Sequence, residues 1–296
     1  MIDYDYIKAS SLQEVFDLLK SYGNRAELIA GGTDVMVNMK RSNTSPGVLI
    51  SLRNIGELRY IRKNGDYHIG ALTTHRMLEN SELVRRELSA LQQGAALVGS
   101  VQVRNVGTIG GNICNAAPSA DTAGPLMILD AVVVLEGPEG RRRVPIDEFF
   151  IGPAETVKNL NEVLVEFEIP EQMGAFGTHY HKHVRRQALN LPIVGVAVGI
   201  RLNEDDTVAD ARIALTVAAP TPIRIYQAEE FLKGKPCTDD NLKEAGLIAA
   251  SPECCSPRDS LRCEGWYRED MIRVLIPRVA KNAVAQLRQR SARSGQ

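Results

Sequence analysis

A pair of adjacent glycines in residues 108–121 (TIGGNICNAAPSAD) is the first feature of this chain that could bind a ligand. Gly110 and Gly111 are followed by small and polar residues and then by one acid, Asp121. Glycine suits positions where the backbone takes a positive φ or where a ligand comes close. Free backbone N–H groups in such a loop favour a phosphate, and the Asp121 carboxylate can accept hydrogen bonds from sugar hydroxyls.

A second segment, residues 29–34, has the same chemistry. Its residues are Ile29, Ala30, Gly31, Gly32, Thr33 and Asp34. We expect each glycine pair to lie in a loop after a strand, so that the two loops grip one long diphosphate ligand from two sides. Either pair alone could equally be a tight turn. Neither fits the GxGxxG or GxxxxGKS/T pattern, so the Rossmann and P-loop mechanisms are not supported.

The two segments, in this order and at this separation, resemble the FAD-binding medium subunits of the molybdenum hydroxylases. These subunits belong to xanthine, carbon monoxide and nicotinate dehydrogenases, and the bacterial xanthine dehydrogenase subunit is the most similar. The resemblance rests on residues 30–34 (AGGTD) and 104–112 (RNVGTIGGN), and it extends from Tyr4 to about Gln286. Residues 161–170 (NEVLVEFEIP), Lys182 with Arg186, and residues 218–224 (AAPTPIR) agree with it.

The resemblance implies which residues touch FAD. Residues 29–34 would contact the diphosphate and the neighbouring sugar, and a second FAD loop would contain Thr108, Gly110, Gly111 and Asn112. Ser119 and Asp121 would line the ribityl–diphosphate region. Leu164 would lie by the flavin ring, although a plain strand-core leucine is an alternative.

Lys182 is the one residue to which the resemblance gives a catalytic role, near the pyrimidine end of the flavin ring. A cation there would stabilise the negative charge of the reduced flavin. The alternative is a solvated strand lysine. His181 stands where the family often has an aromatic residue, and Asn190 where it often has Asp. These departures concern the surroundings of the ring and not the binding loops.

The resemblance also implies electron transfer between subunits. A large subunit with a molybdenum cofactor would hydroxylate the substrate, and a small subunit with two [2Fe-2S] clusters would pass electrons to FAD. FAD would then reduce NAD+ or another acceptor, within a dimer of heterotrimers. A self-contained flavin oxidoreductase and an assembly subunit without cofactor remain alternatives. A purine is the first expectation for the substrate, and nicotinate-like heterocycles, aromatic thioesters and carbon monoxide stay open.

Composition limits the class of protein. The chain has 296 residues, 44% hydrophobic and 24% charged, which is ordinary for a globular protein of one large or two medium domains. A net charge of −1 argues against a general nucleic-acid binder. We expect no secretory signal and no membrane span, because no basic region precedes an apolar run and no apolar segment approaches ~18 residues. A cytoplasmic protein is therefore expected.

The cysteines and histidines give no clear metal pattern. Five cysteines, an odd number, fit a reducing compartment. Cys254, Cys255 and Cys263 lack the paired C-x2-C spacing of zinc sites. His179, His181 and His183 alternate and could share one face of a strand, but no acid or cysteine lies nearby in sequence to complete a site. We therefore predict no metal and no iron–sulfur cluster on this chain.

These residues must be positioned by a fold that we expect to be of the α+β class. The resemblance implies an FAD-binding domain of the vanillyl-alcohol-oxidase (PCMH) type over residues 1–175, with α/β units at about 1–55 and 56–175. A linker at 171–174 would lead to a C-terminal domain, 176–296, with a three-stranded antiparallel sheet and helices.

Hydrophobic periodicity predicts the individual elements. A capping box of Ser10–Ser11 with Glu14 should begin a helix within residues 3–27. Strand, glycine loop and strand follow over 28–39, then a strand at 48–52, a hairpin at 60–72 and mostly helix over 74–103. The expected strands are then 127–135, 143–146, 164–169, 179–184, 193–202 and 208–217. Helices are expected at 228–232, 238–250 and 267–287.

Overall fold

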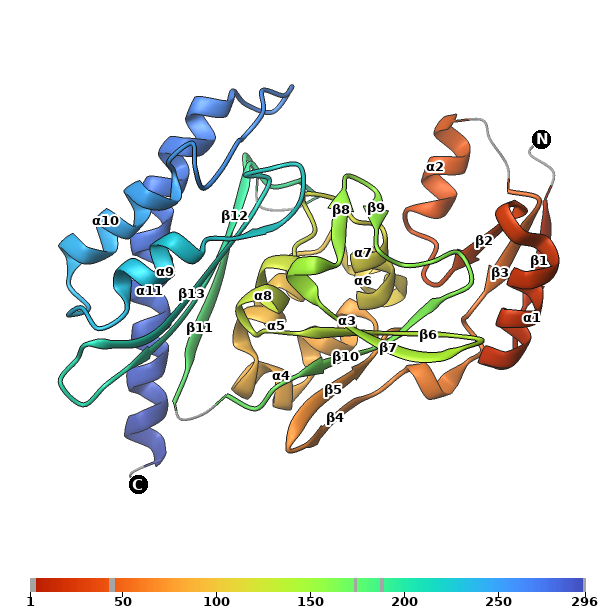
Figure 1. The fold of residues 1–296 in the computed structure, drawn as a ribbon, viewed down its shortest axis with the longest axis horizontal. Coiled ribbons are helices and arrows are strands. Elements are labelled where there is room, and N and C mark those ends of the chain that lie inside the picture. Colours follow the sequence, from red (N-terminus) through yellow and green to blue (C-terminus); the bar gives the residue numbers. More distant parts are fainter. Residues whose placement is uncertain (1–3, 43–45, 173–174, 187–188, 295–296) are drawn as a thin grey trace.

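Three units lie in a row in the computed structural model of this chain, with the N-terminal unit and the C-terminal helices at opposite ends (Figure 1). The structure describes residues 4–42, 46–172, 175–186 and 189–294. Helices and sheets are mixed in all three units, so the α+β class is confirmed. Within these ranges, no helix is both long enough and apolar enough to cross a membrane.

The first unit is a small parallel sheet with strand order β1-β3-β2 and two helices. Ser11 caps the first helix: its Oγ accepts from the Glu14 N–H, as the capping box predicts, while the Glu14 carboxylate accepts from the Ser10 N–H at 2.8 Å, one residue before the cap. Val15 and Phe16 of that helix pack on Ile50 in the central strand. The elements are β1 (Asp5–Lys8), α1 (Leu12–Tyr22), η1 (Gly23–Arg25), β2 (Ala26–Ile29), α2 (Val35–Ser42) and β3 (Val48–Ser51).

The strand expected after the first glycine pair is wrong, because this segment forms the helix α2. The Met36 N–H donates to the Gly32 carbonyl, so the glycine loop leads directly into the first helical turn. The strand was expected because Val35, Met36 and Val37 form a short apolar run. Burial instead follows the helical spacing: Met39 is buried with Val35 and Met36 against it, while Val37 is exposed.

The middle unit is a five-stranded antiparallel sheet, order β4-β5-β10-β6-β7, with six short helices. The predicted hairpin is confirmed, and its turn residue Gly65 has φ 70°. The sheet strands are β4 (Ile61–Asn64), β5 (Asp66–Gly70), β6 (Val132–Gly137), β7 (Gly140–Pro145) and β10 (Val163–Ile169). The other elements are η2 (Gly56–Leu58), α3 (His75–Asn80), α4 (Glu82–Glu87), α5 (Ser89–Ala96), α6 (Val101–Val106), α7 (Ile109–Cys114), α8 (Ala123–Ile128), η3 (Ile146–Glu148), β8 (Phe150–Gly152) and β9 (Glu155–Thr156).

Two expectations for this unit are corrected. The strand predicted over 127–135 begins only at Val132, because Met127 and Ile128 end α8. The run from 125 to 134 is apolar except for Asp130 and carries no period, and the chain turns at Asp130, where φ is 50°. The second expectation concerns the second glycine pair, which does not follow a strand. It lies in the first turn of α7, shortly after α6.

The C-terminal unit is a four-stranded antiparallel sheet rather than the expected three-stranded one. The added strand, β14, has two residues, which is too short to show any periodicity in sequence. The three predicted strands and three predicted helices are confirmed. They are β11 (Gly177–His183), β12 (Val194–Leu202), β13 (Val208–Thr216), β14 (Ile223–Arg224), α9 (Tyr226–Leu232), α10 (Asp239–Ala249) and α11 (Gly265–Ser294).

The C-terminal sheet is covered on both faces. Helices α9, α10 and α11 lie on its outer face, and α5 and α8 of the middle unit lie on its inner face (Figure 1). Ala197 and Ala214 of the sheet belong to the core of the middle unit. Side chains that point inward from β11 therefore reach the middle unit. Of the expected linker, Met173 and Gly174 lie outside the described residues.

Candidate functional site

The two glycine segments meet, as the sequence predicted. A Cβ on Gly31 would lie 2.3 Å from the Val106 carbonyl oxygen and 2.8 Å from the Gly107 Cα. Such distances are far inside van der Waals contact, so only glycine allows the first segment to lie against the turn between α6 and α7. The convergence of segments about 75 residues apart in sequence creates one site from two local patterns.

The four glycines have different tasks. Gly31 and Gly110 serve packing: a Cβ on Gly110 would lie 2.7 Å from the Ala71 Cβ, and its N–H donates to the Ala71 carbonyl at 2.9 Å. Gly32 has φ 75°, which a side chain would strain. Gly111 alone leaves free space, since a Cβ there would meet only the Thr108 Oγ1 at 3.0 Å and the Ala30 Cβ at 4.0 Å.

The second segment is held rigidly in place. Thr108 caps α7 by accepting from the Gly111 N–H at 3.1 Å. A bridge pairs Thr108 with Thr74, the Ile109 N–H donates to the Thr73 carbonyl, and the His75 N–H donates to the Gly107 carbonyl. The backbone around Gly111 is therefore fixed before any ligand arrives, and a rigid backbone loses little entropy on binding.

A cavity of about 350 Å³ opens between the two segments. Ala30 contributes from the first segment, and Val106 and Thr108 contribute from the second. Arg53 and Arg59 bring two guanidinium groups to the same cavity. Neither arginine is among the site residues expected from the sequence.

Lys182 and Asp121 form a buried ion pair, which the sequence analysis did not predict. Lys182 Nζ lies 2.7 Å from Asp121 Oδ2, and the two side chains are only 6% and 7% exposed. Lys182 also donates to the Leu97 carbonyl at 2.9 Å, and the Tyr180 hydroxyl donates to Asp121 Oδ1 at 2.9 Å. The alternative of a solvated strand lysine is therefore wrong.

Burial controls the protonation of this cluster. It raises the pKa of the Asp121 carboxyl, and the nearby Lys182 ammonium opposes that rise. Burial also raises the pKa of Tyr180 well above its ordinary range, and the Asp121 carboxylate adds to the effect. Tyr180 therefore remains a hydrogen-bond donor to Asp121 at neutral pH, and the carboxylate depends on Lys182 for its charge balance.

The remaining predicted residues connect these two parts. Thr122, next to Asp121, donates to Asn112 Oδ1 at 2.6 Å, which ties the ion pair to α7. Leu164 is buried in the core cluster that also contains Ile113 of α7, so it lies behind that helix. Ser119 is half-buried in the connection between α7 and α8.

Family comparison identifies the two parts of the chain. Residues 2–172 match the FAD binding domain in molybdopterin dehydrogenase. Residues 179–283 match the CO dehydrogenase flavoprotein C-terminal domain. The chain belongs to the FAD-binding subunits of the molybdenum hydroxylases. The family expected from the glycine segments is confirmed.

Individual relatives match this flavoprotein over nearly its whole length. The xanthine dehydrogenase FAD-binding subunit of Escherichia coli is 35% identical over 290 residues, covering 96% of this chain and 98% of the relative. The carbon monoxide dehydrogenase medium chain of Hydrogenophaga pseudoflava is 36% identical over 283 residues, covering 95% and 97%. In the solved carbon monoxide dehydrogenase of that organism, the matching chain has a TM-score of 0.92, with 97% and 99% covered.

The site of the flavoprotein fits FAD on its own geometry. Gly111 provides a cradle that a side chain would fill, beside a cavity lined by both glycine segments. A diphosphate can approach a backbone closely only where no Cβ intervenes. When bound, FAD supplies two-electron redox chemistry.

The histidine trio lies on the other face of β11. His183 Nε2 lies 3.2 Å from the Tyr267 hydroxyl of α11, and His179 Nε2 lies 3.4 Å from the Asn282 amide of the same helix. Tyr180 and Lys182, in the alternate positions, point to the middle unit. The trio is therefore part of the packing against α11, on the face of β11 opposite Tyr180 and Lys182.

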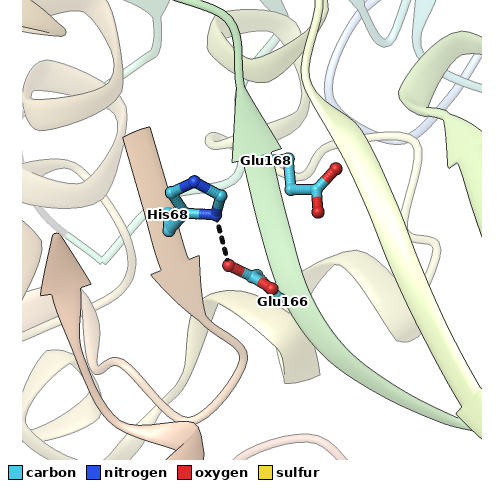
Figure 2. A group of neighbouring side chains, drawn as sticks. All are labelled: His68, Glu166 and Glu168. Atoms are coloured by element: carbon cyan, nitrogen blue, oxygen red, sulfur yellow. Dashed lines mark hydrogen bonds and ion pairs between the residues drawn. The ribbon is translucent and has the colours of Figure 1, made fainter. Parts of the chain in front are cut away.

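One cluster with possible metal-ligand atoms was missed, because β5 and β10 bring together residues about 100 positions apart. Figure 2 shows His68, Glu166 and Glu168, whose ligand atoms all lie within 4.8 Å of one another. His68 Nδ1 lies 2.6 Å from Glu166 Oε1, and Glu168 accepts from Arg143 at 2.7 and 2.8 Å. Each group thus has an ionic partner, and we assign the cluster as a cross-strand ion network.

Proposed function

We propose that the chain carries electrons through FAD in a molybdenum hydroxylase similar to xanthine dehydrogenase. The observation that supports this most is the convergence of the two glycine segments, within a chain that matches such subunits over nearly its full length. Gly32 and Gly111 would border the FAD diphosphate, with Thr33, Asp34 and Asn112 beside them. Ser119 and Asp121 would then lie toward the ribityl chain.

Lys182 would act at the flavin ring from the C-terminal sheet. Its ammonium reaches the middle unit from β11 and is held there by Asp121 and by the Leu97 carbonyl. A cation in this place would stabilise negative charge on the reduced ring. Because Asp121 already balances the charge of Lys182, the electrostatic effect is that of an oriented ion pair and is smaller than that of a free cation.

We further propose that two partner subunits supply the other centres. A large subunit would hold the molybdenum cofactor and a small subunit the [2Fe-2S] clusters, with NAD+ as the acceptor and a dimer of heterotrimers as the assembly. Relatives named as medium chains or FAD-binding subunits support a multi-subunit enzyme. The purine as substrate follows from the similarity to xanthine dehydrogenase. The free thiols of the five cysteines fit the cytoplasm.

The decisive experiment separates an electron-transfer subunit from a complete enzyme. The purified chain should hold FAD, and anaerobic xanthine should leave the flavin absorbance unchanged. Adding the molybdenum and [2Fe-2S] subunits should make xanthine bleach the flavin. Bleaching by xanthine without any partner would place the substrate site on this chain and favour the self-contained oxidoreductase.

A further inference from the structure

Arg53 lies just beyond the carboxyl end of a strand in the parallel sheet of the first unit. The central strand β3 ends at Ser51, and Leu52 and Arg53 follow it directly. The Leu52 N–H donates to the Ile29 carbonyl at 3.0 Å, so the carboxyl ends of β2 and β3 lie side by side. Open α/β sheets bind ligands outside these strand ends. The first glycine segment and Arg53 therefore share one edge of the sheet.

Arg59 joins the same edge through a short connection. It follows the 3-10 turn η2, and its Nη2 donates to the Arg53 carbonyl at 3.3 Å. Both arginines line the cavity that Ala30 and Thr108 also line. Two guanidinium groups thus border the space between the two glycine segments.

The guanidinium charges of Arg53 and Arg59 are not balanced locally. In the part of the chain that the structure describes, neither has a carboxylate within ion-pair distance, and both side chains are exposed. Several other arginines of this chain do have a carboxylate partner, for example Arg104 with Glu79, Arg142 with Glu162 and Arg224 with Glu229. Two unbalanced guanidiniums on one cavity favour an anionic ligand, and guanidinium matches phosphate in a bidentate geometry.

We propose that Arg53 and Arg59 bind the diphosphate of FAD from its adenosine side. This inference rests on the proposed function, since it assigns new residues to the same cofactor. The cavity volume of about 350 Å³ falls within the range of small-molecule sites. The glycine segments then let the diphosphate approach the backbone, and the two arginines supply the positive counter-charge that those segments lack, since their only charged residues are Asp34 and Asp121.

Titration of the FAD-free full-length chain with FAD, followed by flavin fluorescence, tests the assignment. Arg53→Gln and Arg59→Gln should each raise the FAD Kd about 10- to 100-fold, the range for losing a charge-assisted hydrogen bond. The FAD Kd of each variant should also depend less steeply on salt concentration. ADP, used as a competitor, should lose affinity by a similar factor, because it carries the same two phosphates.

Arg25→Gln is the matched control. Arg25 is exposed and belongs to the same unit, but it lies in η1, directly before β2 and so at the amino end of the sheet. Its guanidinium stands over the Tyr22 ring at 5.6 Å. The control removes one positive charge far from the cavity, so its FAD Kd should equal that of the wild type. If Arg25→Gln lowered the FAD affinity as much as Arg53→Gln does, the effect would come from net charge alone and the assignment would be wrong.

Each remaining outcome is decisive. If the wild-type chain binds FAD and both variants bind it equally well, the arginine assignment fails and the proposed function stands. If the wild-type chain binds no FAD, the proposed function fails and the assignment fails with it. If the variants change only the NADH concentration dependence of flavin reduction, the phosphates belong to the acceptor nucleotide and the assignment is wrong. Should Arg53→Gln unfold, Arg53→Lys and Arg59→Gln replace it, each expected to weaken FAD binding.

Discussion

The glycine segments and the Lys182–Asp121 pair are the two halves of the flavin site that we propose, and they are built on opposite principles. The glycine half consists of backbone: its residues matter because they have no side chain, and Gly31 brings two backbones within contact. The lysine half consists of two buried charges from different units, joined at 2.7 Å. One half selects its ligand by shape, and the other acts on it by charge.

This difference has an energetic consequence. A side chain added to a rigid backbone cradle excludes the ligand almost completely, because the backbone around it cannot give way. A change in the ion pair affects the whole fold first, since a buried charge without its partner destabilises a protein by about 3–5 kcal/mol. The following predictions use these consequences to separate the two halves.

Gly111→Val should produce the largest effect, a nearly complete loss of FAD from a folded chain. Its Cβ would enter the free space beside Ala30 and the Thr108 hydroxyl. Thermal unfolding checks the fold, and the flavin-to-protein absorbance ratio checks binding. Gly56→Val is the control, because a Cβ on Gly56 meets no atom within 4 Å. A Gly111→Val chain with a full complement of FAD would show that this glycine does not border the cofactor.

Asp121→Asn should have the next largest effect, about 3–5 kcal/mol of lost stability. The substitution keeps the shape but leaves the Lys182 ammonium buried without an anion. Urea unfolding measures the loss. The double variant Asp121→Asn with Lys182→Met should recover much of it, because it removes both charges. A loss in the double variant equal to the sum of the losses in Asp121→Asn and Lys182→Met alone would mean that the pair is not coupled.

Acid should weaken the glycine half through His75, which is buried and donates its backbone N–H to Gly107. Burial, with the Arg104 charge nearby, lowers the pKa of His75 from 6.5 to about 4. The folded pKa is depressed, so stability is full above pH 6.5 and falls between pH 6.5 and 4 as the unfolded chain takes up the proton. The full loss is about 3 kcal/mol.

Unfolding curves at pH 7 and pH 4.5 test this dependence. His75→Phe should remove the part of the pH dependence that belongs to this imidazole. An unchanged pH dependence in the variant would assign the acid sensitivity to other groups.

The glycine half could be predicted from the sequence because each glycine segment is a contiguous pattern. Strands whose apolar residues alternate clearly could be predicted for the same reason. Asp121 and Lys182 were each expected at the site, but their ion pair could not be predicted, since they are 61 positions apart and meet only because β11 turns alternate side chains toward the middle unit. Helix α2 was expected to be a strand because Val35, Met36 and Val37 form a short apolar run, which does not distinguish a strand from a helix. Arg53 did carry a signal: it directly follows a buried strand of a parallel sheet, where ligands bind.

The smallest expected effect concerns the flavin potential and tests how the lysine half acts. Lys182→Met should lower the midpoint potential by about 30 mV, which corresponds to ~1.4 kcal/mol for two electrons, with FAD still bound. The physical reason is the loss of a cation while the Asp121 carboxylate remains beside the site. Redox titration with reference dyes measures the shift.

If the ion pair acts as a unit, the double variant Lys182→Met with Asp121→Asn should return toward the wild-type potential, since both charges are gone. A double variant that stays as low as Lys182→Met would assign the stabilisation to the lysine charge alone. If the midpoint potential of Lys182→Met were unchanged, the lysine half would have no effect on the flavin. Its role would then be structural, joining the C-terminal sheet to the middle unit.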